Sequence, residues 1–448
     1  MKKVLLLIGA AAMVMALATP SMAQFKSWGH IEVQSVYYMN KLNSFNNGLN
    51  GTREDVAERF LAERFRFYLQ YGDPKTIRAV IGFEGDGNYW GDGSSGRNHM
   101  SNLNTDQVAL EIKHAYLDMV IPQTPLTLRA GMFWWDVGGG FFMAQDAPGF
   151  KLTANFAPHK ISAFMYREYD ESTTTYNVSD MYGLQYLLKQ KMFDLEAYFA
   201  YLNDLRDHDI GGGNYTDQPW FAGVIAGYRP GNWDFGAQFN YSGGTMKARD
   251  SGYSDIDYKG WAAKASANYK IGPGLIVGIE GFYSTGNDAD KTDEIDRFRV
   301  ANNSETYSGF GNYRSVYFYK ASGVFGPNYN GYQGDFSTNW PWGTWYGDVN
   351  VEYSPTAWLR LIANYMYIGD TAKGTPGMGI INTPFGARQD KDEDYVGSEI
   401  NLTAQFRVYK STQFIIGGGY FFPGDVFDTP TKSADNGYNI LSRLVYSF

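Results

Sequence analysis

The chain has 448 residues, a formal net charge of −9 and no cysteine. An acidic chain lacks the basic footprint that nucleic acid requires, and a chain without cysteine cannot form disulfides, thiol nucleophiles, Cys-ligated metal centres or lipid anchors. The 35 Tyr, 30 Phe, 11 Trp and 52 Gly, beside a mean hydropathy of −0.37, are typical of a transmembrane β-barrel, in which only alternate residues face lipid.

The N-terminus has the three parts of a secretory signal. Lys2 and Lys3 precede an apolar run from residue 4 to residue 18, and Pro20 is followed by small residues up to Ala23. The apolar run is shorter than the ~20 residues that a membrane-spanning helix needs. We therefore expect a cleaved signal peptide at 1–23 and a single domain at 24–448, an exported transmembrane barrel.

The remaining chain consists of segments in which apolar and polar residues alternate. A period of two places alternate side chains on opposite faces of a strand. The pattern predicts an all-β, antiparallel, up-and-down barrel of 16–18 strands, with 18 favoured. The predicted strands are 26–39, 65–71, 76–86, 106–120, 125–133, 150–157, 159–168, 179–190, 192–203, 219–229, 233–241, 257–270, 274–285, 344–354, 357–369, 399–408, 411–422 and 436–448.

Connections of two lengths separate these strands. Short turns at 72–75, 230–231 and 272–274 are predicted to face the periplasm. Longer polar segments are predicted to face outward, at 40–59, 87–105, 204–218, 286–343 and 370–394. A secreted β-sandwich or β-helix is the soluble alternative, but it would rarely combine so many long strands with aromatic residues near their ends.

Three parts of the chain resemble known outer-membrane proteins. The last strand ends on Phe448, as in proteins read by the barrel-assembly machinery. Residues 128–133, followed by Gly138–Gly140 and the segment 146–150, resemble porins whose third loop folds into the barrel. Residues 395–402 and 417–424 resemble the closing strands of the alginate-export family. The resemblance implies a Gram-negative outer-membrane porin, a homotrimer surrounded by lipid and lipopolysaccharide.

Lumen-facing charges form the candidate site. A basic wall is predicted from four arginines that alternate with apolar residues, namely Arg64, Arg66, Arg78 and Arg129. The resemblance places Asp136 and Asp146 opposite them, on an inward-folded constriction loop. Rings of charge and pore width set selectivity in such channels. The alternative is that these charges solvate a wide lumen or pair with neighbouring acids such as Glu63, Glu84, Asp86 and Glu111.

Trp134 and Trp135 open the same Gly-rich segment. Tryptophan rings there could stack on a sugar, but packing that holds the loop to the wall is the favoured interpretation.

The favoured function is passive diffusion of small hydrophilic solutes or ions. The alternatives are a substrate-specific channel, an exporter of acidic polysaccharide, an adhesive barrel that works through 286–343, and an outer-membrane hydrolase. A hydrolase is disfavoured because His30, His99, His114, His159 and His208 lack metal-ligand spacing. Asp207-His208-Asp209 is interpreted as a solvated turn. The acidic stretches Asp288–Asp290 and Asp390–Asp394 lack the spacing of a calcium loop, so no metal or cofactor is expected.

Overall fold

The computed structural model describes residues 25–40, 57–90, 99–100, 110–170, 178–210, 212–287, 293–301, 315–316, 343–371, 394–425 and 433–448. Of residues 58, 86–89, 99–100 and 210 it describes the backbone alone. The predicted signal peptide lies outside these ranges. Within them, no helix is long and apolar enough to cross a membrane.

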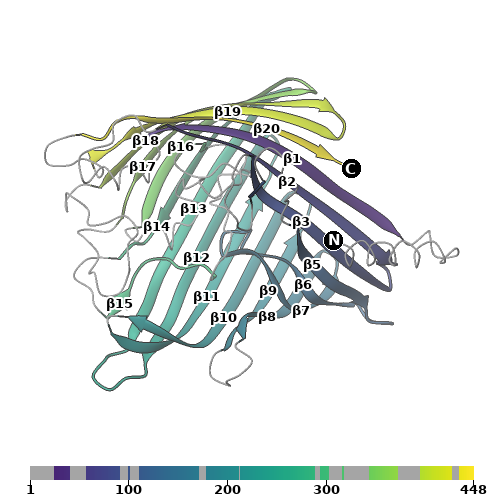
Figure 1. Cartoon of the computed structure of the whole chain (residues 1–448), viewed down its shortest axis with the longest axis vertical. Helices are drawn as coiled ribbons and strands as arrows, with labels where there is room; N and C mark the ends of the chain where they lie inside the picture. The colour runs from purple at the N-terminus through teal and green to yellow at the C-terminus, as the bar shows by residue number, and fades with distance from the viewer. Residues whose placement is uncertain are drawn as a thin grey trace.

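Eighteen strands form one antiparallel sheet that closes into a barrel (Figure 1). They are β1 (Lys26–Met39), β2 (Ala57–Gly72), β3 (Ile77–Trp90), β5 (Glu111–Val120), β6 (Leu126–Val137), β7 (Met143–Phe156), β8 (His159–Asp170), β9 (Val178–Lys189), β10 (Phe193–Ile210), β11 (Gly213–Tyr228), β12 (Trp233–Ala248), β13 (Ile256–Gly272), β14 (Leu275–Ser284), β16 (Thr344–Thr356), β17 (Leu359–Gly369), β18 (Tyr395–Tyr409), β19 (Thr412–Pro423) and β20 (Gly437–Ser447). Two short strands, β4 (His99–Met100) and β15 (Glu294–Ile295), pair in parallel with β3 and β13.

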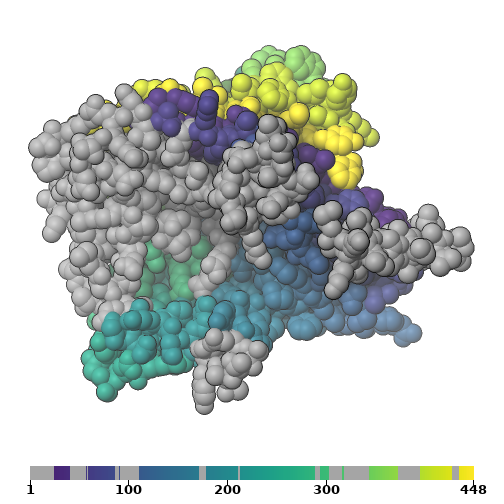
Figure 2. All heavy atoms as spheres, viewed as in Figure 1, coloured from purple at the N-terminus to yellow at the C-terminus, as the bar shows by residue number. Residues whose placement is uncertain are grey.

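The first and last strands close the barrel. β1 pairs with β20 from His30↔Ser447 to Met39↔Tyr438. Gly29 and Phe448 exchange both backbone hydrogen bonds at 3.0 Å. Figures 1 and 2 show the purple N-terminal strands lying against the yellow C-terminal strands. Closure removes both sheet edges, so every wall strand has a hydrogen-bonded neighbour on each side.

The two faces of the wall reverse the arrangement of a soluble protein. On β18 the apolar Ile400 and Leu402 are 45% and 64% exposed, whereas the polar Glu399 and Asn401 are fully buried inside. Burying polar groups while exposing large apolar ones is unfavourable in water, where apolar surface drives burial. The same arrangement suits a wall with hydrocarbon outside and polar groups lining its lumen.

Aromatic side chains form two bands on the outer face. Near the short turns, Trp233 packs on Tyr269 at 4.7 Å, and Phe67 on the terminal Phe448 at 6.3 Å. Near the opposite rim, Trp261 stacks on Tyr283 at a ring-centroid distance of 4.9 Å. Tyr and Trp favour the headgroup level of a bilayer, so the bands mark its two interfaces.

The predicted architecture is confirmed, with 18 as the strand number. The outer loop predicted at 204–218 is wrong. β10 continues through Ile210 and β11 begins at Gly213, so these residues form a tight hairpin. Its residues are mostly polar, and alternation disappears where neither face meets lipid. Backbone pairing nevertheless continues there.

Candidate functional site

The tips of β6 and β7 leave the barrel wall and enter the lumen. β5 pairs with β6 only up to Ala115↔Met132, and β8 pairs with β7 only up to Tyr166↔Gly149. The pairing of β6 with β7 continues to Val137↔Met143. Residues 133–148, called the inward hairpin below, therefore pair with each other and with neither neighbouring wall strand.

Two glycines mark the point of departure. Gly131 and Gly149 are cross-strand partners in the β6–β7 register. A Cβ atom on either would lie 2.3 Å from a carbonyl oxygen of the neighbouring wall strand, at Ala115 and Met165 respectively. Gly131 also has a φ of +124°, a conformation that side chains disfavour. Glycine at both positions thus permits the bend.

The tip of the hairpin is a left-handed glycine turn bound to the opposite inner surface. Gly138, Gly139 and Gly140 have φ values of +72°, +60° and +75°. The Gly138 amide donates to Glu196 Oε1 at 2.7 Å. The Gln238 side chain donates to the Gly138 carbonyl at 3.1 Å. Consecutive amides in such a turn form a concave anion site, which the Glu196 carboxylate occupies.

Aromatic packing extends the tip across the lumen. Phe142 stacks on Tyr198 of β10 at 4.9 Å and contacts Phe221 of β11 at 4.7 Å. Phe141 lies 5.5 Å from Phe282 of β14. Strands β8 to β13 separate β7 from β14 along the sheet, so the tip reaches a distant part of the inner surface. The inward fold of this segment is therefore present, as a hairpin with a five-residue tip at 138–142.

Trp135 packs at the base of the inward hairpin. It is 1% exposed, and its indole nitrogen donates to the Ala147 carbonyl at 2.9 Å. Its ring contacts Phe133, Phe164 and Tyr166. The structure thus places Trp135 in the packing role favoured from the sequence, where a sugar could not reach its face.

The basic wall lies in an ion-pair network on β2–β6. Arg64 Nε is 3.6 Å from Glu84 Oε1, and Arg66 forms a close ion pair with the same carboxylate. Lys113 Nζ lies 2.6 Å from the other Glu84 oxygen. Glu84 is 1% exposed, so three cations surround one buried anion. Sequence reasoning named Glu84 as a pairing partner but missed Lys113.

The other two arginines share a second acid. The Arg78 guanidinium binds Asp118 Oδ2 at 2.7 Å and 2.9 Å, and Arg129 binds both Asp118 oxygens at 2.6 Å and 2.9 Å. Arg129 also lies 4.6 Å above the Tyr116 ring. Two guanidinium groups on one carboxylate leave a net positive charge facing the lumen. Sequence reasoning missed Asp118, although it sits between Leu117 and Met119 on the polar face of a predicted strand.

The two acids predicted for the constriction lie on strands. Asp136 is near the end of β6, is exposed, and accepts a hydrogen bond from the Gly140 amide. Asp146 lies in β7, where it contacts Lys113 Nζ and His114 Nε2, each at 2.7 Å. Both belong to the inward hairpin, and Asp146 joins the hairpin to Lys113, which shares Glu84 with Arg64 and Arg66.

Further acids line the inner face of β14–β18. They are called the acidic wall below and comprise Glu280, Asp348, Glu352 and Glu399. Glu280 accepts from the Tyr346 hydroxyl at 2.8 Å, and Asp348 accepts from the amides of Asn350 and Asn364 at 3.0 Å and 2.6 Å. A neutral donor stabilises a carboxylate without cancelling its charge. Glu352 differs, because it pairs with Arg360 of β17 at 2.5 Å. Cations therefore predominate in the basic wall, and carboxylates predominate in the acidic wall.

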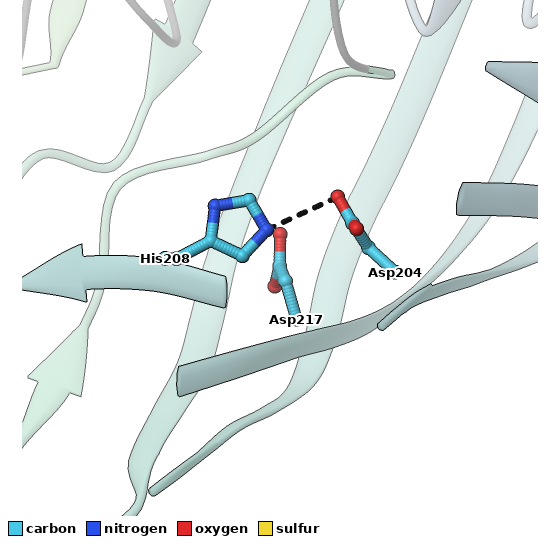
Figure 3. A group of neighbouring side chains, drawn as sticks. All are labelled: Asp204, His208 and Asp217. Carbon is cyan, nitrogen blue, oxygen red and sulfur yellow. Dashed lines mark ion pairs between the residues drawn. The ribbon is translucent and has the colours of Figure 1, made fainter. Parts of the chain in front are cut away.

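A third polar cluster lies on the β10–β11 hairpin. Asp204, His208 and Asp217 point toward one another (Figure 3), and their ligand-type atoms lie within 4.8 Å of each other. His208 Nε2 is 3.1 Å from Asp204. Each carboxylate also binds an arginine, Asp204 to Arg206 and Asp217 to Arg299, at 2.5 Å. The cluster is an ion-pair network that joins the two strands, and His208 belongs to it rather than to the solvated turn expected from the sequence.

Solved structures, among them that of a BenF-like porin from Pseudomonas fluorescens Pf-5, share this architecture, with 12% sequence identity and a TM-score of 0.51 for that structure, over 94% of this chain and 98% of that chain. The chain is similar to OpdK with vanillate and to OccK8 (OprE), both from Pseudomonas aeruginosa, and to OccAB4 from Acinetobacter baumannii. Sequence identities are 11%, 12% and 10%, and TM-scores are 0.52, 0.54 and 0.54. The matches cover 94%, 94% and 95% of this chain and 98% of each of those chains. At these identities the likeness shows the fold alone, a closed antiparallel barrel like those of the solved structures.

No protein-family model and no curated protein sequence matches the chain.

Proposed function

We propose that the chain is an outer-membrane channel through which small hydrophilic solutes diffuse passively. The observation that carries the proposal is the inward hairpin, which leaves the wall and reaches from β7 to β14. A hairpin in this position narrows an otherwise wide lumen and brings solutes close to charged side chains. It favours small solutes over an acidic polysaccharide, because it occupies part of the cross-section.

The charge distribution supports selection by sign. The basic wall and the acidic wall lie on different parts of the barrel, so a field runs across the pore between them. Such a field orients charged or dipolar solutes, and its strength depends on how little water separates the walls. The proposal assigns Arg64, Arg66, Arg78 and Arg129 to the basic side. It assigns Asp136 and Asp146 to the hairpin that faces the passage.

The proposal also includes the partners expected from the sequence. The chain would lie in lipid and lipopolysaccharide, be inserted by the barrel-assembly machinery through Phe448, and form a homotrimer. The outward apolar face and its two aromatic bands support the membrane assignment, because they match the hydrocarbon layer and its interfaces.

A planar-bilayer recording tests the proposal. Purified protein should produce discrete conductance steps. The triple variant Arg64→Gln, Arg66→Gln and Arg129→Gln should show a reversal potential in a salt gradient that indicates greater selectivity for cations. Arg249→Gln is the matched control, because Arg249 pairs with the exposed Asp207 outside the basic wall. A membrane that stays sealed at all voltages would contradict the channel, and an unchanged reversal potential would contradict the basic wall.

A second candidate is a preference for small aromatic carboxylates. The Arg129 guanidinium lies 4.6 Å from the Tyr116 ring centroid and 5.2 Å from the Phe133 ring centroid. A cation therefore lies beside an aromatic surface. One similar structure, that of OpdK, contains vanillate. Liposome swelling should then be faster with vanillate than with a neutral sugar of similar size. Equal rates would exclude this preference and leave the general channel standing.

A further inference from the structure

A second segment lies inside the barrel beside the inward hairpin. Residues 293–301 follow β14, and β15 within them pairs with β13 at Asp257↔Glu294 and Tyr258↔Ile295. Phe298 and Ala301 are each 1% exposed. This stretch, called the inner segment below, borders the tip of the hairpin.

Arg299 fastens the inner segment to three wall strands. Its guanidinium binds Asp217 Oδ2 of β11 at 2.5 Å and the Tyr258 hydroxyl of β13 at 2.7 Å. The Tyr258 hydroxyl donates to the other Asp217 oxygen at 2.9 Å, which closes a triangle of hydrogen bonds. The Arg299 amide donates to Ser242 Oγ of β12 at 3.2 Å. Asp217 and Tyr258 are 2% and 5% exposed, so the anchor is shielded from water and salt.

The residues around this anchor hold the hairpin tip. The Ala301 amide donates to the Phe142 carbonyl at 3.0 Å. Phe298 stacks on Phe141 with ring centroids 5.5 Å apart and an interplanar angle of 17°. Both contacts lie within two residues of Arg299 along the chain. Fixing Arg299 therefore fixes the two surfaces against which the tip rests.

We propose that Arg299 is a positioning residue for the constriction: it holds the inner segment against β11–β13, and the inner segment holds the tip of the inward hairpin at a fixed position. The inference rests on the proposed function in so far as the hairpin narrows a pore. The planar guanidinium donates in fixed directions, here from one nitrogen to Asp217 and from the other to the Tyr258 hydroxyl, so Arg299 sets the orientation of the segment as well as its distance from the wall.

Electron paramagnetic resonance tests the proposal without requiring conductance. The chain has no cysteine, so Asp136→Cys introduces a single thiol on the exposed part of the hairpin for a nitroxide label. Arg299→Gln in this background should raise the ratio of mobile to immobile label about tenfold, the factor that corresponds to ~1.4 kcal/mol. Arg299→Lys should give a smaller rise, because lysine keeps the charge but loses the planar fork.

Arg249→Gln is the matched control, since it removes an arginine ion pair from the same group of strands away from the tip. It should leave the spectrum unchanged. If Arg299→Gln does not fold, Asp217→Asn removes the same ion pair from the wall side and should mobilise the label equally. A label as immobile in the variant as in the parent would overturn the proposal. A mobilised label in a protein that forms no conductance steps would instead sink the proposed function.

Discussion

At the scale of single residues, the lumen charges act in clusters in which several cations share one carboxylate. Asp118 partly neutralises Arg78 and Arg129, just as Glu84 partly neutralises Arg64, Arg66 and Lys113. Buried carboxylates of this kind allow several cations to lie close together, since each guanidinium would otherwise repel the next. The selectivity of the pore should consequently depend on the acids as much as on the arginines.

Asp118→Asn tests this dependence. The substitution removes the negative charge and keeps the shape, while Arg78 and Arg129 stay protonated. The reversal potential in a salt gradient should therefore indicate greater selectivity for anions. This change is opposite in sign to the one expected for the arginine variants. The shift should shrink as salt rises, because ions screen lumen charges. A shift toward cations, or none in dilute salt, would contradict this assignment of the basic wall.

The arginines were predictable because each alternates with apolar neighbours on one strand. Of their partners Glu84 was named in advance, but Asp118 was not, because a cross-strand contact depends on the exact register between strands, which period-two alternation within one strand does not give. Asp118 meets Arg129 directly in the β5–β6 register. The position of Lys113 depends on the irregularity between Gly82 and Phe83 in the β3–β5 pairing, which has no signature in the sequence.

At the scale of elements, the inward hairpin shows where sequence patterns stop being informative. All the wall strands were predictable, because lipid on one side imposes alternation on each of them. In the hairpin both faces lie inside the barrel, so contact with lipid does not impose alternation of apolar and polar residues there. Its residues pack through aromatic contacts and through the Glu196 carboxylate in the glycine turn. The resemblance predicted an inward-folded loop at this place. That the loop is a hairpin formed by the paired ends of β6 and β7 was seen only in the structure.

Gly138→Ala should loosen the tip of this hairpin. The added Cβ would lie 2.9 Å from both Phe142 Cβ and Tyr198 Cε1, in a backbone with a φ of +72°. Gly231→Ala is the matched control, because Gly231 has a φ of +60° with nothing within 4 Å of the added Cβ. Both variants place a side chain on a left-handed backbone conformation, which lowers the free energy of unfolding by ~1–2 kcal/mol in each.

The difference between the two variants isolates the steric effect at the tip. Denaturant midpoints in detergent should fall further for Gly138→Ala than for Gly231→Ala, and its single-channel current should become noisier. Equal midpoints together with equal noise would show that the tip is not packed as described.

At the scale of the whole molecule, different parts of the chain close the barrel wall and narrow the pore. The β1–β20 pairing and the exchange between Gly29 and Phe448 close the wall, and neither involves the inward hairpin. The barrel should accordingly tolerate loss of the hairpin while the pore changes. Gly131 and Gly149 are register partners at the point of departure. An Asn-Gly turn in place of residues 132–148 would join them as a tight two-residue hairpin.

The conductance of this shortened barrel, measured beside the intact chain in planar bilayers, tests the central claim most directly. If the hairpin narrows the passage, the shortened protein should show larger unitary steps and a reversal potential closer to that of an unselective pore. Steps of the same size and selectivity in both proteins would contradict the claim that residues 133–148 form the constriction.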